Sequence, residues 1–400
     1  MCRRRRRHRR VPTGRRPLRR HLDPDRPPLI ELVEAIRRRG PIPFSEVVEA
    51  ALYDQDEGFY ATTGTAGRAG DFITSPELGP LFGAVVASAL DSWWQAMGAP
   101  DPFVVVEAAA GPGTLCRTVL DAAPTCARAL RYVLVERSGA QRARHGERLP
   151  LEHAAQAFAP THDVEAEDAS APAEQPLGPI VVSLAELPRL EGPCIVLANE
   201  LLDNLPFDLY ERRRGEWMEV RAGLAGGQAS LVEVVVAVAE LPAELEDVMA
   251  PDGARVPLQR AAAAWVRDAV RLAGPAGRVV CFDYARRTTA ELAARPSSEW
   301  LRTYRKHGPG GEPLDRLGSQ DITTEVAVDQ LPQPTAITTQ AQWLSDHGID
   351  ELLASARAAW HERAAIGDLT ALLAKSRVHE AAALAAPDGP GAFLVLEWAT

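Results

Sequence analysis

The sequence predicts an α/β fold in which a Rossmann-like, largely parallel sheet carries helices on both faces. Three observations lead to this prediction. Short, wholly apolar segments recur along the chain, as in strands that are buried on both faces of a sheet. Segments with apolar residues at helical spacing lie between them. The apolar segment 103–108 passes through a turn of small residues into a helix, as the first unit of a doubly wound sheet does.

The composition fits a soluble protein of one elaborated domain or two. The chain has 400 residues, of which 46% are hydrophobic and 24% are charged, and no apolar run is long enough to span a bilayer. The five cysteines include no Cys-x-x-Cys pair and no accompanying histidine cluster. We therefore expect no metal site, no disulfide framework, no membrane contact and a reducing compartment, which favours the cytoplasm.

The first 22 residues differ from the rest of the chain. They contain 11 arginines and no acid, and without them the formal net charge would change from −10 to −21. We expect residues 1–22 to be a disordered basic tail. Nucleic-acid binding and a mitochondrial transit peptide are the alternatives for such a segment, although we expect no nucleic-acid partner for the acidic body.

The N-terminal region reads as helical. Two short helices are expected over residues 29–54, separated by a turn at 40–43. Another helix should begin at residues 75–77, where Ser is suited to the N-cap, Pro to the first helical position and Glu to the first turn. Apolar residues then recur at helical spacing over 82–93. We assign residues 23–100 to an N-terminal helical cap.

The remaining residues, 101–400, are expected to form the main domain. Residues 159–178 read as a surface loop, and the alternating pattern of 209–240 predicts an inserted β ribbon. A helix is expected over 258–272, where it ends before a Gly-Pro pair. Buried strands are expected at 103–108, 132–136, 180–182, 194–198, 279–282 and 393–396.

Polar side chains follow several of these strands. Ligands bind beyond the carboxyl ends of the strands in a parallel sheet, so these side chains should converge on one site. They are Glu107, Glu136, Asn199, Glu200 and Asp283.

The turn after the first strand indicates an adenosine-containing cofactor. Glu136, at the tip of the second strand, is placed to accept hydrogen bonds from both ribose hydroxyls. The residues around the turn allow a dinucleotide or S-adenosylmethionine. Gly111 and Gly113 are followed by Leu115 and Cys116, so the Gly-x-Gly-x-x-Gly spacing is absent, which counts against NAD and a dehydrogenase.

Five separated motifs resemble one family, the MidA-type methyltransferases, which are related to the mitochondrial complex I assembly arginine methyltransferase. The resemblance covers residues 29–397 and implies a class I methyltransferase fold with S-adenosylmethionine as cofactor. It also implies a protein substrate with an exposed arginine, such as an arginine on a respiratory-complex subunit. The motifs are Gly58-Phe59-Tyr60, the Gly70–Glu77 segment, the Ala198–Pro206 segment, the Leu301–His307 segment and Gln320-Asp321-Ile322-Thr323.

The resemblance also implies roles for individual residues. Glu107, Ala109, Gly111 and Gly113 correspond to the cradle for the methionine part of the cofactor, and Glu136 to the ribose acid. Ala109 stands where the family pattern has glycine, so a positive φ there would strain the loop and weaken cofactor binding.

The motif before the third predicted helix adds further candidates. Asp71, Ser75 and Glu77 belong to a segment that either binds the cofactor carboxylate through helix N–H groups or forms a structural lid.

The acceptor site is expected after the fourth strand. Glu200 and Asp203 are hypothesised to orient an arginine nitrogen, with Asn199 as a further acceptor of hydrogen bonds; the alternative for these acids is helix capping. Two other functions fit the sequence. One is a non-catalytic assembly factor on the same fold, which Ala109 would favour, and the other is a small-molecule N-methyltransferase.

Overall fold

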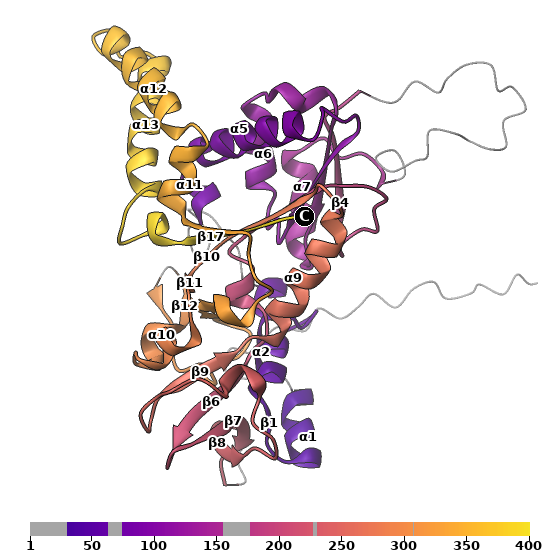
Figure 1. Ribbon diagram of the computed structural model, residues 1–400, viewed down its shortest axis with the longest axis vertical. Helices are drawn as coiled ribbons and strands as arrows, with labels where there is room; N and C mark the ends of the chain where they lie inside the picture. The colour runs from indigo at the N-terminus through magenta and orange to yellow at the C-terminus, as the bar shows by residue number, and fades with distance from the viewer. Residues whose placement is uncertain (1–29, 63–73, 155–176, 227–229, 307) are drawn as a thin grey trace, which may run out of the picture.

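The computed structural model describes residues 30–62, 74–154, 177–226, 230–306 and 308–400. Within these ranges, seven strands form the central sheet in the order β16-β17-β10-β5-β2-β3-β4 (Figure 1). The strands are β2 (Phe103–Ala108), β3 (Leu130–Val135), β4 (Ile180–Leu184), β5 (Ile195–Asn199), β10 (Arg278–Asp283), β16 (Ala336–Thr339) and β17 (Leu394–Ala399).

The pairing of the strands confirms the predicted fold class. From β4 through β3, β2 and β5 to β10, all neighbouring strands are parallel, and β17 then runs antiparallel to both β10 and β16. Each of the six predicted strands is present, with its ends shifted by at most a few residues. Apolar continuity predicted them well because both faces of this sheet are covered.

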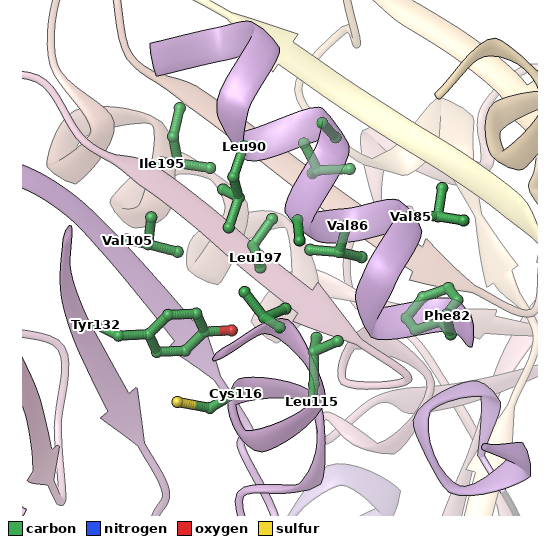
Figure 2. Packing of buried hydrophobic residues seen from close by; sticks show 14 of the residues in the cluster. Phe82, Val85, Val86, Leu90, Val105, Leu115, Cys116, Tyr132, Ile195 and Leu197 are labelled. Carbon is green, nitrogen blue, oxygen red and sulfur yellow. The ribbon is translucent and has the colours of Figure 1, made fainter. Parts of the chain in front are cut away.

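Helices bury both faces of the central sheet. On one face lie α5 (Pro80–Ala96) and α6 (Thr114–Asp121), whose apolar side chains meet those of β2, β3 and β5. Figure 2 shows Phe82, Val86 and Leu90 of α5 above this layer. The opposite face is covered by α9 (Arg260–Ala273), the helix predicted over 258–272. A further helix, α7 (Gly139–Arg148), follows β3.

The predicted continuous helix from Ser75 is wrong in one respect. The chain forms a short α4 (Ser75–Leu78), breaks at Gly79 and restarts as α5; Thr74, not Ser75, is the N-cap residue of α4. The break lies at the residue before Pro80, where helical backbone is disfavoured. Glycine is required there because a Cβ at Gly79 would lie 2.2 Å from the carboxyl carbon of Glu380. The carboxylate of Glu380 instead accepts the Leu81 N–H, in the first turn of α5.

A second, antiparallel sheet lies beside the first. In the described part of the chain it has five strands in the order β1-β7-β6-β9, with β8 paired to β7, so the predicted β ribbon is present within a larger sheet. Its strands are β1 (Ile42–Pro43), β6 (Asp208–Arg213), β7 (Glu216–Leu224), β8 (Leu231–Ala237) and β9 (Arg255–Leu258).

The N-terminal helices pack on this second sheet. The apolar side chains of α1 (Ile30–Arg39), α2 (Phe44–Tyr53) and α3 (Phe59–Thr62) join a cluster with β6 and β7, whereas α5 packs on the central sheet. Residues 23–100, expected as one helical cap, are thus divided between two cores over their described part. Residues 1–22 and most of the predicted 159–178 loop lie outside the described residues.

The segment after β10 forms a small third sheet and the C-terminal helices. An antiparallel trio, β13-β12-β14, lies next to the second sheet, and a helical hairpin of α12 and α13 projects from the central sheet (Figure 1). No helix among the described residues is long and apolar enough to cross a membrane. These elements are β11 (Ala285–Arg286), α10 (Thr289–Ala293), β12 (Leu301–Arg305), β13 (Gly308–Pro309), β14 (Asp321–Thr324), β15 (Val326–Ala327), α11 (Gln340–Asp346), α12 (Ile349–Arg363) and α13 (Leu369–Leu384).

Candidate active site

A cavity of about 1120 Å³ opens at the carboxyl ends of β2, β3 and β5. It exceeds the usual volume of a pocket for one drug-sized ligand, so it has room for a cofactor and an acceptor group together. Its far wall is formed by β12 and β14. Six predicted site residues line it: Ala109, Gly111, Glu136, Asn199, Glu200 and Asp203.

The turn after β2 forms one end of the cavity in a left-handed backbone conformation. The φ angles are 53° at Ala109, 52° at Gly111 and 82° at Gly113. A Cβ on Gly111 would meet none of the described atoms within 4 Å, so it would project into open space at the cavity wall. Ala109 lies at the same wall with its side chain exposed. Its positive φ is the backbone conformation that we expected to strain the loop at this position.

Glu136 joins this turn to the start of α7. Its Oε2 accepts the Gly111 N–H at 2.9 Å, and its Oε1 accepts the Ser138 N–H at 2.7 Å. Burial raises the pKa of Glu136, while these N–H donors act in the opposite direction. The carboxylate is therefore held in a fixed orientation at the wall of the cavity, and each oxygen keeps a lone pair for a ligand hydroxyl.

Other predicted cofactor residues lie away from the cavity wall. Glu107 is on the same face of β2 as the core, where its carboxyl accepts a 2.7 Å hydrogen bond from Tyr132, and burial raises its pKa to about 8. Gly113 is the N-cap residue of α6. Neither residue lines the cavity.

The helix-start residues have partners within the protein. Ser75 Oγ donates to Gln340 Oε1 at 3.1 Å, and Glu77 Oε1 accepts a hydrogen bond from Thr114 Oγ1 at 2.5 Å. Because α4 has only four residues, it offers little of the dipole that an anion site needs. The structure thus favours the structural alternative for Ser75 and Glu77, and Asp71 lies outside the described residues.

Carboxyl groups gather at the other end of the cavity. Burial raises the pKa of Glu200 to about 8, that of Asp321 to about 7 and that of Asp203 to about 6, and the neighbouring carboxyls raise the first two further. Glu200 has a φ of 51° and accepts a 3.1 Å hydrogen bond from Asn199 Nδ2. Burial of three acids in one space favours their protonated forms, and a cationic ligand bound between them would favour the carboxylates.

Two buried oxygen atoms at this end have no hydrogen-bond partner among the described residues: Asn199 Oδ1 and Asp203 Oδ1. The other oxygen of Asp203 accepts a 2.5 Å hydrogen bond from Thr323, which fixes the carboxyl group. Buried acceptors without donors are costly in a folded protein. Their presence on a cavity wall indicates a ligand that donates hydrogen bonds.

Asp321 and Tyr60 are site residues that we did not predict. The Tyr60 hydroxyl donates to Asp321 Oδ1 at 3.1 Å, and Asn204 Nδ2 donates to the same oxygen at 3.1 Å. On its other side, the Tyr60 carbonyl accepts a hydrogen bond from Ser138 Oγ at 2.7 Å, beside Glu136. Both residues occur in motifs that carry the family resemblance, which is the sequence feature that could have identified them as site residues.

Asp283, also predicted at a strand end, has a structural role. Its carboxyl accepts the N–H groups of Leu202 and Tyr284, and it does not line the cavity. The described residues contain no group of three or more His, Cys, Asp or Glu side chains arranged to hold a metal ion.

Comparison with known proteins identifies the family. Residues 85–345, more than half of the chain, match the family model described as "Putative S-adenosyl-L-methionine-dependent methyltransferase". The chain belongs to this methyltransferase family. The MidA-type resemblance of the motifs is thereby confirmed, and S-adenosylmethionine, the cofactor that this resemblance implies, is the cofactor of the family.

Relatives of this methyltransferase are known in animals and bacteria. It is 33% identical over 226 residues to the mitochondrial protein arginine methyltransferase NDUFAF7 homolog of Drosophila melanogaster, covering 53% of this chain and 49% of that protein. The mouse NDUFAF7 protein is 28% identical over 232 residues, covering 54% and 50%. The chain thus spans about half the length of the curated relatives it matches.

A solved structure agrees with the fold over most of the chain. A protein from Burkholderia thailandensis, described as a COG1565 superfamily member and likely methyl transferase and bound to S-adenosyl-homocysteine, superposes with a TM-score of 0.72 at 26% identity. The superposition covers 92% of this chain and 91% of the Burkholderia chain. A native structure from the same organism gives a TM-score of 0.70 at the same identity, covering 92% and 90%. The predicted class I methyltransferase sheet is confirmed by this agreement.

Proposed function

We propose that this protein transfers a methyl group from S-adenosylmethionine to a guanidinium nitrogen of an arginine on a protein acceptor. One observation carries the proposal: the glycine turn with Glu136 and the buried acids Glu200 and Asp203 line the same cavity. The first group suits a nucleoside cofactor, and the second suits a cation. The names of the animal relatives, which are protein arginine methyltransferases, support this choice of acceptor.

At the cofactor end, we assign Gly111 and Ala109 to the wall beside the methionine part and Glu136 to the ribose. The open space over Gly111 leaves room for a ligand against the backbone, and the exposed position of Ala109 means that its methyl group is not wedged into the protein. When bound, S-adenosylmethionine supplies an electrophilic methyl group on a positively charged sulfur.

At the acceptor end, Glu200 and Asp203 grip the guanidinium and Asn199 Oδ1 accepts one of its N–H groups. An arginine side chain is a poor nucleophile because it stays protonated, with a pKa above about 12. Carboxylates in its plane hold the positive charge on the nitrogens they contact and leave the remaining nitrogen better able to attack. The methylated nitrogen then loses its extra proton, and a carboxyl oxygen of Glu200 or Asp203 accepts it.

Asp321 supports this site without contacting the guanidinium itself. Its Oδ1 is held by Tyr60 and Asn204, so its negative charge is fixed in position close to Asp203. Tight placement of the nucleophile accounts for much of the rate in an in-line displacement. The acids therefore serve mainly to align the acceptor.

The proposal is tested by binding and by transfer. Calorimetric titration of S-adenosylhomocysteine should show micromolar affinity. The wild type should bind the 2′-deoxy analogue more weakly than S-adenosylhomocysteine, whereas Glu136→Ala, which lacks the ribose partner, should bind the two equally. Transfer of labelled methyl groups to arginine peptides should fall at least a hundredfold in Glu200→Gln and Asp203→Asn. Glu186→Gln, which removes an exposed acid from the same cavity, is the control.

The outcomes separate the competing functions. Failure of a folded wild-type protein to bind the cofactor would contradict the proposal and favour the non-catalytic assembly factor. Cofactor binding with transfer to small amines but to no peptide would favour the small-molecule enzyme.

For cell location we propose the cytoplasm, on the basis of the unpaired cysteines. Four of them are buried and free in the described residues. The animal relatives are named as mitochondrial, so fractionation of cells that produce the full chain is the test. Recovery in a mitochondrial fraction with a shortened N-terminus would contradict a cytoplasmic location and identify the arginine-rich tail as a transit peptide.

A further inference from the structure

The acceptor end of the cavity has a positively charged residue beside its acids. In the antiparallel pair β12 and β14, Arg302 lies opposite Thr323 and Tyr304 lies opposite Asp321. Side chains opposite each other on a sheet share a face, so all four point into the cavity, which they line. Thr323 in turn contacts Asp203, and Arg302 lowers the pKa of that acid.

The charge of Arg302 is only partly used within the protein. Its nearest carboxylate, Glu325, is buried and is shared with Arg286 and Arg295. Arg295 makes bonds of 2.7 and 3.1 Å to the two oxygens and Arg286 one of 3.0 Å, whereas Arg302 is at 3.3 Å. A carboxylate offers about four lone-pair sites, and these contacts fill them. Arg295 also pairs with Glu299 at 3.1 Å, so the three guanidinium groups share two carboxylates and positive charge stays in excess around Glu325.

Arg302 is also held in place for a ligand. Its guanidinium lies 5.5 Å from the ring centroid of Tyr284, and it donates a 3.3 Å hydrogen bond to the Tyr304 hydroxyl. Its Nε is buried and has no hydrogen-bond partner in the described part of the chain. Of the three arginines around Glu325, Arg302 lines the cavity, whereas Arg286 and Arg295 do not. An ordered guanidinium with a free donor is a typical anion-binding group.

We infer that Arg302 binds a carboxylate of the acceptor, so that the preferred substrate carries an acidic residue within one or two positions of the methylated arginine. The inference rests on the proposed function, in which the acids bind the guanidinium of an arginine. Arg302 and Asp321 occupy diagonal positions of β12 and β14, about 7–8 Å apart, which is close to the spacing of side chains two positions apart on the same side of an extended peptide. A neutral or purely basic peptide would leave the buried Nε of Arg302 without a partner.

Peptide binding tests this inference without requiring methyl transfer. Fluorescein-labelled, N-terminally blocked and C-terminally amidated arginine peptides with Asp or Asn two positions from the arginine are titrated with the full chain, with and without S-adenosylhomocysteine. The wild type should prefer the Asp peptide about tenfold, as expected for one well-placed ion pair. Arg302→Met should bind both peptides equally, and Arg302→Lys should retain part of the preference.

The matched control is Arg286→Met, which also removes an arginine from Glu325 but lies outside the cavity wall. It should keep the preference for the Asp peptide. Equal binding of the two peptides by the wild type, or an unchanged preference in Arg302→Met, would overturn the inference. Arg302 would then be a counter-charge for Asp203, and its loss would lower stability alone.

The source of the carboxylate is resolved by two small acceptors. Arginine and agmatine differ by one carboxylate. If the preference for arginine over agmatine is larger than the preference for the Asp peptide over the Asn peptide, Arg302 binds a free guanidino acid, and the peptide assignment is overturned. If the Asp peptide binds through Arg302 but is never methylated, the inference stands and the proposed transfer to arginine fails.

Discussion

The imidazole of His145 holds the carbonyl group of Gly111 in place. Nε2 lies 2.8 Å from the Gly111 oxygen, and Nδ1 lies 2.8 Å from Ser183 Oγ. A carbonyl oxygen only accepts hydrogen bonds, so Nε2 carries the proton and Nδ1 accepts from the serine hydroxyl. Burial lowers the pKa of His145, which keeps the ring neutral.

We therefore predict that His145→Phe weakens cofactor binding by about fivefold, because one buried hydrogen bond to the turn is worth about 1 kcal/mol. Titration calorimetry with S-adenosylhomocysteine measures this change. Ser183→Ala should have a smaller effect, since Ser183 contacts only the far nitrogen. Unchanged affinity in a folded His145→Phe protein would show that the turn needs no support from this histidine.

Ala109→Gly should raise the stability of the protein. Alanine at a φ of 53° costs about 1 kcal/mol, and glycine adopts this conformation freely at some cost in chain entropy. We expect a gain of about 0.5 kcal/mol in urea unfolding and equal or tighter binding of S-adenosylhomocysteine. A loss of stability would mean that the methyl group of Ala109 makes a contact that offsets the strain.

The buried acids predict how stability depends on pH. Burial raises the pKa of Glu200 to about 8, whereas an unfolded glutamate titrates near pH 4 to 5. Between these values the folded state retains a proton that the unfolded state has lost, so the free energy of unfolding falls as the pH rises. Glu200→Gln should flatten this fall and be more stable than the wild type at pH 8 by about 1–3 kcal/mol.

Urea unfolding of the ligand-free protein from pH 5 to pH 9 measures this dependence. Glu186→Gln serves as the control, because Glu186 is exposed, and its profile should follow that of the wild type. Parallel profiles for the wild type and Glu200→Gln would contradict the raised pKa.

Gly83→Ala should destabilise the packing of α5 on α6. A Cβ on Gly83 would lie 2.0 Å from Thr118 Oγ1 and 2.9 Å from the Thr118 carbonyl carbon. Relief requires movement of the helices, for which we expect a cost of about 1–3 kcal/mol in thermal or urea unfolding. The double variant Gly83→Ala, Thr118→Ala should recover part of this loss, and no recovery would indicate that the backbone contact dominates.

Local sequence patterns were sufficient for six strands of the central sheet but not for its edge strand β16, the second sheet or the acceptor site. The strands of the parallel sheet are apolar throughout, so short windows reveal them. Strand β1 consists of Ile42 and Pro43 alone, and it exists because Ala222 and Arg221 pair with it across the chain. The meeting of Asp203 with Thr323, 120 residues apart, is likewise set by the packing of β14 and not by any local pattern.

The helices after residue 340 show a different limit. In α13, apolar residues occur all around the helix, and Leu369, Leu372 and Leu373 are exposed. Without a single apolar face, the periodicity that predicts a packed helix is weak.

The cluster beneath the acceptor site has a consequence for how the protein is made. It combines Phe44 and Phe59 with Leu209 and with Trp300 and Ile322, which are far apart in the chain. A ribosome adds about 5–20 residues per second, so the first helices emerge on the order of ten seconds before their last partners. Their apolar faces stay uncovered until those partners have been synthesised. The proposed acceptor site therefore forms only once residues 321–325 have been made, and strand β17 of the central sheet is added later still.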